Sequence, residues 1–429
     1  MSPQEHARQL DAADPLRDSR AGFHLLPAGQ IYLDGNSLGL LPRAAEGSVQ
    51  RALDAWKTLA IGGWLDAVPP WFTLAERLAA RVARLVGARP EEVAVANSTT
   101  VNLHQCLGTL YRPDPTGART KILAFADEFP SDLYAIASHL RGRGLDPAQH
   151  LTLVPSGADG LLDHDRILRA FADDPAIQLA VLPAVVYTTG QLLDLPAITA
   201  AAHRAGITIG FDLSHSIGVV PHTLSADGAD FAFWCHYKYL NAGPGAPGGL
   251  YLNARHTGCL PGLAGWWGSH KDRMFDLGRT LDPADGASAL QIGTPTILGL
   301  AALDGALDAT EAAGMAAIRD KSLRLTAYLM AQLEARLPFA PAAFRFANPR
   351  EDHRRGGHVA LAHPEGARLC RALKAAGVIT DFRPPDIVRL APVPFYNTFE
   401  ECHETVERLH CIVTERAYLA FPTERALVT

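Results

Sequence analysis

The sequence predicts an α/β protein built on a doubly wound, mainly parallel β-sheet, followed by a smaller α+β domain. The first observation is a set of strand-length runs that are almost continuously apolar, as parallel strands covered on both faces must be: residues 93–98, 121–125, 150–155, 177–186, 207–212 and 230–235. The second is that helical segments separate these runs, at 99–111, 131–143, 163–172 and 195–205. Repeated strand–helix–strand units fold into a parallel sheet with helices on both faces.

The pattern changes near residue 305, where a long helical stretch, 306–336, leads into shorter alternating strands and helices. We expect this part to form a separate small domain. The N-terminal residues show no apolar pattern that would give them a core of their own, so they are expected to pack with the small domain. The predicted division is an N-terminal segment, a large domain and a small domain, at 1–60, 61–305 and 306–429.

The composition is that of an ordinary globular protein, with 48% hydrophobic and 20% charged residues. The 39 Lys and Arg residues face 45 Asp and Glu residues, so the net charge is −6 and no basic run is present to bind nucleic acid. The N-terminus is charged and no apolar stretch is long enough to span a membrane. Six cysteines without a CxxC pair indicate reduced thiols. These features predict a cytoplasmic protein that binds neither nucleic acid nor a membrane.

Three short motifs match known functional patterns, but the residues around each motif argue against that function. GNSLG at 35–39 matches the nucleophile elbow of serine hydrolases, but Leu-Leu-Pro follows where a helix should begin, so Ser37 is expected to contact a ligand instead. GPGAPG at 243–248 matches a dinucleotide-binding turn, but it contains two prolines and a strand follows it. The cysteine and histidine pairs at 402–403 and 410–411 fit one helix with a buried stripe, and no metal site is expected.

The most informative stretch places an acid and an amine at the ends of neighbouring strands. Asp212 ends one apolar strand and Lys238 follows the next, at the carboxyl edge where open α/β sheets bind ligands. A lysine amine can form a Schiff base with an aldehyde. A carboxylate can keep a pyridine nitrogen protonated, which makes the ring an electron sink. The pair therefore predicts pyridoxal 5′-phosphate as the cofactor.

A phosphate site and a ring contact are predicted nearby. Thr99 and Thr100 lie between a strand and the start of a helix, where free N–H groups and the helix dipole favour an anion, although simple N-capping would also explain them. In EFPSD at 128–132, Phe129 is placed to lie against a ring and Asp132 to hydrogen-bond near it, although by itself this motif would be a simple capping turn.

Five separated motifs, in order, resemble the kynureninase family of fold-type-I pyridoxal phosphate enzymes: YLDGNSLGLLP, DLSHSIG, WCHYKYLNAGPG, AGWWGSH and VRLAPVPFYN. The resemblance runs from about residue 31 to the C-terminus. It implies hydrolysis of the Cβ–Cγ bond of L-kynurenine to anthranilate and L-alanine, a step of tryptophan breakdown by the kynurenine pathway that also leads to NAD biosynthesis. The nearest alternatives are a cysteine desulfurase or a class-V aminotransferase, but the first needs a mobile thiol and Cys370 lies in a helical stretch.

The resemblance also implies residue roles. Lys238 is the cofactor-bound lysine, Asp212 the partner of the pyridine nitrogen and Tyr237 a proton relay. The cofactor contacts that it implies are Thr99, Thr100, Phe129, Asp132, Asp212, His215, Tyr237, Lys238, Trp266 and Thr294. Trp266 is implied to reach the phosphate from a neighbouring subunit, which makes the protein a homodimer. Arg389 is implied to bind the substrate α-carboxylate, as its planar fork suits.

Two positions bear on the substrate. Thr294 stands where relatives that favour 3-hydroxykynurenine have asparagine, and Trp64 resembles an aromatic residue of bacterial enzymes that favour kynurenine. Both imply that kynurenine is the better substrate. Ser37 completes the predicted substrate contacts. One departure is Pro183, which stands where the family pattern has a small hydroxyl residue at the cofactor.

Overall fold

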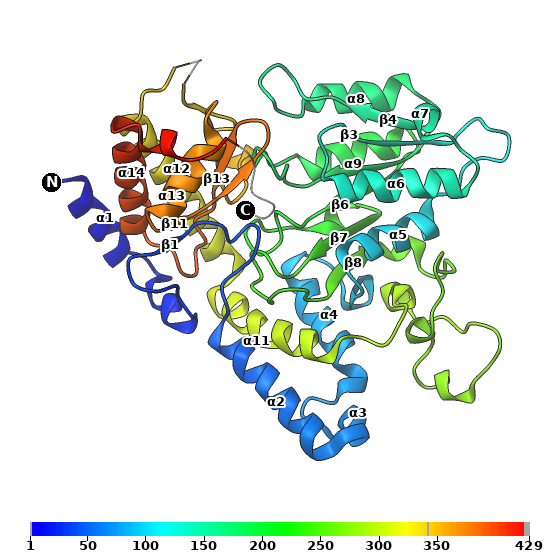
Figure 1. Ribbon diagram of the computed structural model, residues 1–429. Helices are drawn as coiled ribbons and strands as arrows, with labels where there is room; N and C mark the ends of the chain where they lie inside the picture. Colours follow the sequence, from blue (N-terminus) through cyan, green and yellow to red (C-terminus); the bar gives the residue numbers. More distant parts are fainter. Residues whose placement is uncertain (1, 341–342, 424–429) are drawn as a thin grey trace.

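The computed structural model describes residues 2–340 and 343–423. The chain forms a large part around one central sheet and a smaller part that contains the C-terminal helices (Figure 1). Of the described residues, none forms a helix that is long and apolar enough to cross a membrane.

The large part is built on a seven-stranded sheet with the order β2-β8-β7-β6-β5-β3-β4. All neighbours pair in parallel except β8, which runs antiparallel to both β2 and β7. The expected doubly wound, mainly parallel sheet is therefore confirmed. Its strands are β2 Val93–Ala96, β3 Lys121–Phe125, β4 Leu151–Val154, β5 Ile177–Pro183, β6 Thr208–Asp212, β7 Phe231–Cys235 and β8 Gly248–Leu252.

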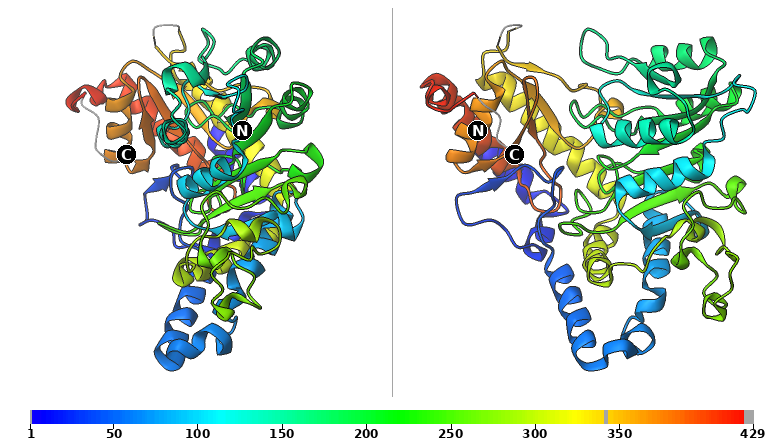
Figure 2. Two further views of the ribbon diagram at one scale, coloured as in Figure 1. Left: turned by 90° about the vertical axis from the view of Figure 1, so that its right-hand side faces the viewer. Right: turned by 45° about the vertical axis from the view of Figure 1, so that its right-hand side comes forward.

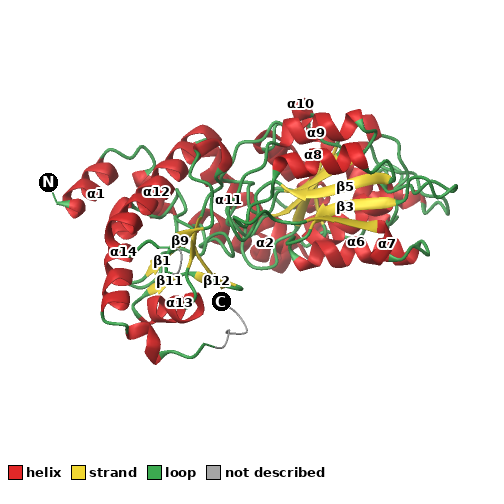
Figure 3. Cartoon of the chain, turned by 90° about the horizontal axis from the view of Figure 1, so that it is seen from above, coloured by secondary structure: helices red, strands yellow, loops and turns green. Residues whose placement is uncertain are grey.

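Helices cover both faces of this sheet, as Figure 3 shows from above. One face buries apolar side chains of α4, α8, α9 and α11, and the other those of α5 and α6. This double cover explains why the strands are apolar on both sides. The helices of the large part are α4 Leu74–Leu85, α5 Thr99–Leu110, α6 Pro130–Gly142, α7 Pro147–His150, α8 His164–Asp173, α9 Leu195–Arg204 and α10 Leu224–Asp227.

The small part has an antiparallel sheet with the order β12-β13-β10-β9, packed against helices. The N-terminal segment joins it, because α1 packs on α14 and β1 pairs in parallel with β11. Its elements are α1 Pro3–Ala12, β1 Ile31–Tyr32, α12 Met315–Arg336, β9 Arg345–Phe346, β10 Val359–Ala362, α13 Gly366–Ala375, β11 Val378–Ile379, β12 Asp381–Arg383, β13 Ile387–Leu390 and α14 Phe399–Thr414.

The helical stretch expected at 306–336 is two helices, α11 Ile297–Ala313 and α12, which meet at Gly314 with a φ of +76°. Leu303 and Leu307 of α11 belong to the core of the large sheet, whereas Leu325 of α12 belongs to the core of the small part. The connection between the two parts thus runs through this break. The domain limits given above stay a prediction.

Two further helices, α2 Arg43–Leu59 and α3 Gly63–Asp66, extend away from both parts. Figure 2 shows them as a projecting arm whose base lies along α11. Exposed apolar side chains mark this arm, among them Ile61, Leu65 and Val68, which are 81%, 71% and 89% exposed. Such side chains on a projection are typical of a surface that another chain covers.

Candidate active site

A cavity of about 220 Å³ lies at the carboxyl edge of the large sheet, beyond the ends of β6 and β7. Three parts of the chain line it: the loop after β1, the large sheet with its helices, and the strands β12 and β13 of the small part. The lining residues are Asn36, Ser37, Thr99, Thr100, Phe129, Ser131, Asp132, Tyr187, Asp212, Ser214, His215, Tyr237, Lys238, Arg383 and Arg389.

Most of the residues predicted from the sequence therefore come together in this one cavity. Those that line it are Ser37, Thr99, Thr100, Phe129, Asp132, Asp212, His215, Tyr237, Lys238 and Arg389. Trp64, Trp266 and Thr294 do not line it. Pro183 is the neighbour of Asp212 in the register of β5 and β6, which places it beneath the cavity.

Lys238 and His215 form the centre of the cavity. Lys238 follows β7, and its Nζ lies 2.8 Å from Nε2 of His215, which belongs to the turn after β6. Burial, and then the charge of Lys238, hold the pKa of His215 well below its usual value. The imidazole is therefore neutral near pH 7, and its Nε2 accepts a hydrogen bond from the amine.

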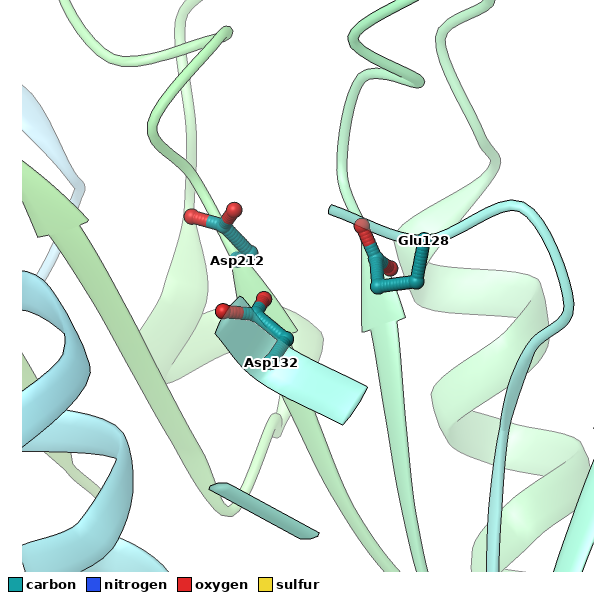
Figure 4. Close-up of side chains that lie close together, drawn as sticks. All are labelled: Glu128, Asp132 and Asp212. Atoms are coloured by element: carbon teal, nitrogen blue, oxygen red, sulfur yellow. The ribbon is translucent and has the colours of Figure 1, made fainter. Parts of the chain in front are cut away.

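Asp212, Asp132 and Glu128 bring three carboxyl groups to one side of the cavity, with one oxygen from each lying within 4.8 Å of the others (Figure 4). Asp212 accepts a hydrogen bond of 2.8 Å from the backbone N–H of Ser214. Burial raises the pKa of Asp212, and the charge of Lys238 acts in the opposite direction. Burial, followed by the charge of Asp212, raises the pKa of Glu128 to about 8.

Two helix N-termini meet at another side of the cavity. Thr99 and Thr100 are the first residues of α5, and the side chain of Ser98 makes no capping hydrogen bond there. Thr100 Oγ1 lies 2.7 Å from Oγ of Ser131, in the first turn of α6. Because the first N–H groups of a helix have no partner within it, this corner suits an anion such as a phosphate.

Arg389 lies on β13 and is held from several directions. Its Nε donates to Asp381 Oδ1 at 2.6 Å, its Nη1 to the carbonyl oxygen of Tyr187 at 2.8 Å, and its Nη2 to Ser37 Oγ at 2.9 Å and to Asp381 Oδ2. Arg383 also donates to Asp381, at 2.6 and 2.9 Å, and its guanidinium lies 5.9 Å from the centre of the Tyr187 ring. One buried carboxylate thus orients both arginines of the cavity.

The sequence reasoning missed seven residues of this site: Asn36, Glu128, Ser131, Tyr187, Ser214, Asp381 and Arg383. Glu128 and Ser131 lie within the EFPSD motif and could have been included from their spacing. Asp381 is the antiparallel partner of Arg389 on β12 and β13. No signal in the sequence indicates this pairing, because it depends on the register between two short strands.

The predicted residues outside the cavity gather around Trp267. The ring centres of Trp64 and Trp267 lie 5.5 Å apart, those of Trp266 and Trp267 6.1 Å apart, and the backbone N–H of Trp267 donates to Ile292 O, close to Thr294. Trp266 is 47% exposed. These three predicted residues therefore share one surface of the chain rather than its cavity.

The cavity fits pyridoxal phosphate. Lys238 offers the amine, Asp212 the carboxylate, Phe129 a ring face and α5 an anion site. Buried polar atoms in the cavity also lack partners among the described residues, as a site built for a polar group requires: Oδ2 of Asp132, Oγ of Ser214 and Nδ1 of His215.

Solved structures share this fold. The cystine C-S lyase C-DES has a TM-score of 0.76 at 19% identity, over 89% of this chain and 98% of its own. The cysteine desulfurase CsdA from Escherichia coli has a TM-score of 0.74 at 19% identity, over 98% and 99% of the two chains. A variant of C-DES carries glycine covalently linked to its pyridoxal phosphate cofactor. At these identities the likeness concerns the fold alone.

Fold and site together define a pyridoxal phosphate enzyme of fold type I. The model of the kynureninase C-terminal domain matches residues 318–409. Kynureninases from Geobacillus thermodenitrificans and Bacillus cereus are 50% and 49% identical to this chain over 424 residues, which is 99% of the chain and 97% of each relative. The chain belongs to the kynureninase family, whose members are hydrolases of a carbon–carbon bond.

Proposed function

We propose that the chain hydrolyses the Cβ–Cγ bond of L-kynurenine to anthranilate and L-alanine and accepts 3-hydroxykynurenine less well. The observation that carries this is the joint position of Lys238, Asp212 and Arg389 in one cavity. A cysteine desulfurase is disfavoured because Cys370 is buried in α13 and its Sγ contacts Thr380. Addition of kynurenine to the purified protein, followed by anthranilate fluorescence, tests the proposal. Absence of fluorescence with a fully loaded enzyme would refute it.

Lys238 is the residue that moves protons. Its amine is the group that would hold the cofactor aldehyde, and the same amine is placed to take a proton from the substrate Cα. The contact with His215 supports this role, because a neutral imidazole orients the amine without competing for its charge. Proton transfer by a positioned side chain contributes roughly 10²- to 10⁴-fold to a rate.

Asp212 is the carboxylate that would keep the cofactor ring electron-withdrawing. When bound, pyridoxal phosphate supplies an electron sink for negative charge that develops on the substrate carbon atoms. The carboxylate of Asp212 keeps the pyridine nitrogen protonated, and the Ser214 N–H holds that carboxylate in place. Thr99 and Thr100 would receive the phosphate, and Phe129 would lie against the ring, since all three line the same cavity.

Tyr237 is the proposed proton relay. It adjoins Lys238 in sequence and lines the same cavity. Burial raises the pKa of its phenol, with Cys235 and Asp212 adding to the effect. The phenol therefore stays protonated near pH 7, can donate a proton to the substrate Cβ as the Cβ–Cγ bond breaks, and can regain one from the water that adds to Cγ.

Arg389 and Ser37 bind the substrate α-carboxylate. Asp381 holds the guanidinium in place, and the Ser37 hydroxyl already occupies one of its donors. A carboxylate can take the place of this hydroxyl and of the Tyr187 carbonyl, since both are neutral and the ligand is charged. Arg383 adds positive charge at the same edge of the cavity.

We further propose that the protein is a homodimer in which each cavity receives Trp266 from its partner. The surface around Trp267 supports this, because it gathers Trp64, Trp266 and Thr294 although none of them lines the cavity of its own chain. Phe275 and Leu277 lie beside it in sequence and are 66% and 74% exposed. Monomeric proteins rarely expose so many large apolar side chains.

Substrate preference and location complete the proposal. Trp64 and Thr294 would face the aromatic ring of the substrate across the dimer interface and favour the ring without a 3-hydroxyl group. The ratio of kcat/KM for kynurenine and 3-hydroxykynurenine tests this, and a ratio that favours the hydroxylated substrate would contradict it. A cytoplasmic location and a role in tryptophan breakdown are proposed with it; all six cysteines are free, as a reducing compartment requires.

A further inference from the structure

One carboxyl group next to the cavity has neither a role in the proposed function nor a predicted contact with the cofactor. Glu128 lies between β3 and α6, is 4% exposed, and its carboxyl group faces those of Asp132 and Asp212 (Figure 4). One oxygen from each of the three lies within 4.8 Å of the others. Like charges this close in a buried site do not all ionise together. One or more of the three groups therefore holds a proton near neutral pH.

The hydrogen bonds show which group carries the charge. Asp212 accepts from the backbone N–H of Ser214 at 2.8 Å, and the positive charge of Lys238 also favours its ionised form. Glu128 receives less support. Its Oε1 accepts from the backbone N–H of Phe129 at 2.9 Å, and its Oε2 is buried without a partner among the described residues. The negative charge therefore belongs on Asp212.

The two oxygens of Glu128 match a neutral carboxylic acid. In that form one oxygen is a carbonyl acceptor and the other carries a hydroxyl donor. Oε1 already accepts a hydrogen bond, so Oε2 is the oxygen that carries the proton. Among the described residues, Oε2 has no hydrogen-bond partner. Oδ2 of Asp132 is likewise buried without a hydrogen-bond partner among the described residues. Burial, and then the charge of Asp212, raise the pKa of Glu128 to about 8, which also favours its protonated form near neutral pH.

We propose that Glu128 is a positioning residue, held as a neutral acid beside Asp132 and Asp212, which keeps the negative charge of the cluster on Asp212, where the pyridine nitrogen would bind. The proposal rests on the proposed function only for the presence of that ring. Asp132 from α6 also faces Glu128, whereas the charge of Lys238, beyond β7, acts on Asp212 and Asp132. Tyr187 is also near, and burial raises the pKa of its phenol, so it adds no charge.

The test compares Glu128→Gln and Glu128→Ala in the substrate-free holoenzyme. Glutamine keeps a carbonyl acceptor and replaces the hydroxyl by an N–H donor, whereas alanine removes both. The readouts are the dissociation constant of pyridoxal phosphate and the pH titration of the lysine–cofactor absorption band. The matched control is Asp127→Asn, since Asp127 is the preceding residue, is exposed, and bonds only Ser156 among the described residues.

Glu128→Gln is expected to leave the dissociation constant within about twofold and the titration unmoved, as Asp127→Asn does. Glu128→Ala is expected to weaken cofactor binding about tenfold or more and to shift the titration, because Asp212 loses the polar group that faces it in a buried site. Infrared difference spectra of the wild type and Glu128→Gln should show the carbonyl stretch of a protonated carboxylic acid in the wild type alone.

Two results would overturn the proposal. If Glu128→Gln moves the titration as far as Glu128→Ala does, the residue acts as an anion; if Glu128→Ala matches the wild type, the residue has no part in the site. Should Glu128→Ala fail to fold, the glutamine variant and its infrared spectrum decide alone. A wild-type enzyme that shows the absorption band but releases no anthranilate would refute the proposed function and leave this test unaffected.

Discussion

The amine of Lys238 lies 2.8 Å from Nε2 of His215, and the two residues belong to loops after adjacent strands, β7 and β6. The contact joins the proposed proton-transfer group to a buried imidazole whose pKa lies well below its usual value because of burial and of the lysine charge. A neutral partner holds the amine in position while leaving it free to exchange its proton.

Replacement of His215 should therefore disturb the lysine more than the fold. For His215→Leu we expect kcat/KM to fall by about tenfold to hundredfold, the range for loss of a hydrogen bond to a charged group. Steady-state kinetics from pH 6 to 9 measure this. His6→Gln serves as the control because His6 is exposed on α1, and an unchanged kcat/KM in His215→Leu would contradict the assigned role.

Replacement of Asp212 by Asn should leave the cofactor bound but nearly inert. The amide does not keep the pyridine nitrogen protonated, so we expect kcat to fall by about 10³-fold or more, near the upper range for a lost proton-transfer partner. Absorption spectra check that the cofactor is retained, and anthranilate release gives the rate. Turnover close to that of the wild type would show that the ring nitrogen needs no anionic partner here.

Asp381 should matter for stability as well as for substrate binding. Asp381→Asn leaves the buried guanidinium of Arg389 without a countercharge, and we expect a loss of about 3–5 kcal/mol in urea unfolding. Burial alone would raise the pKa of Asp381, but Arg389 and Arg383 hold it below its usual value of 3.8. Its contribution is thus present above that value and is lost as the pH falls through the folded-state pKa. The difference between variant and wild type should shrink at such low pH; a constant difference would contradict this.

Mixed dimers test the exchange of Trp266. Lys238→Ala and Trp266→Ala should each have little activity alone. A mixed dimer contains one cavity that combines the native Lys238 of one chain with the native Trp266 of the other, so random mixing should restore about a quarter of the wild-type activity and the isolated mixed dimer about half. Co-expression with two affinity tags isolates the mixed dimer. If mixing restores nothing, Trp266 does not complete the partner cavity.

The carboxyl cluster should give the cofactor-free protein a distinct pH dependence. The pKa of Glu128 rises from 4.5 to about 8 on folding, so the native state binds an extra proton between these values. Stability is then full below about pH 4.5 and falls as the pH rises through about 8. Thermal unfolding midpoints should decline across this range and decline less steeply in Glu128→Gln. Equal slopes in both proteins would show that Glu128 does not hold the proton.

The sequence by itself determined the sheet, because strands buried on both faces must be apolar along their whole length, and runs such as those that became β5 and β7 have this pattern. It also placed Asp212 and Lys238 at one edge, since parallel strands end on the same side of a sheet. These local patterns predicted the cofactor and part of the cavity, whereas His215, Tyr237 and Arg389 were implied by the resemblance to the family.

Tertiary structure alone decided the rest. Asp381 meets Arg389 only through the register of β12 and β13, and nothing local to either strand fixes that register. Glu128 acquires its raised pKa from burial beside Asp212, which lies 84 residues away in sequence, and Trp64, Trp266 and Thr294 gather on one surface only when the arm of α2 and α3 packs beside Trp267. Contacts between segments that are distant in sequence exist only in the folded chain. The sequence therefore predicts which residues have the required chemistry, and the fold decides which of them come together.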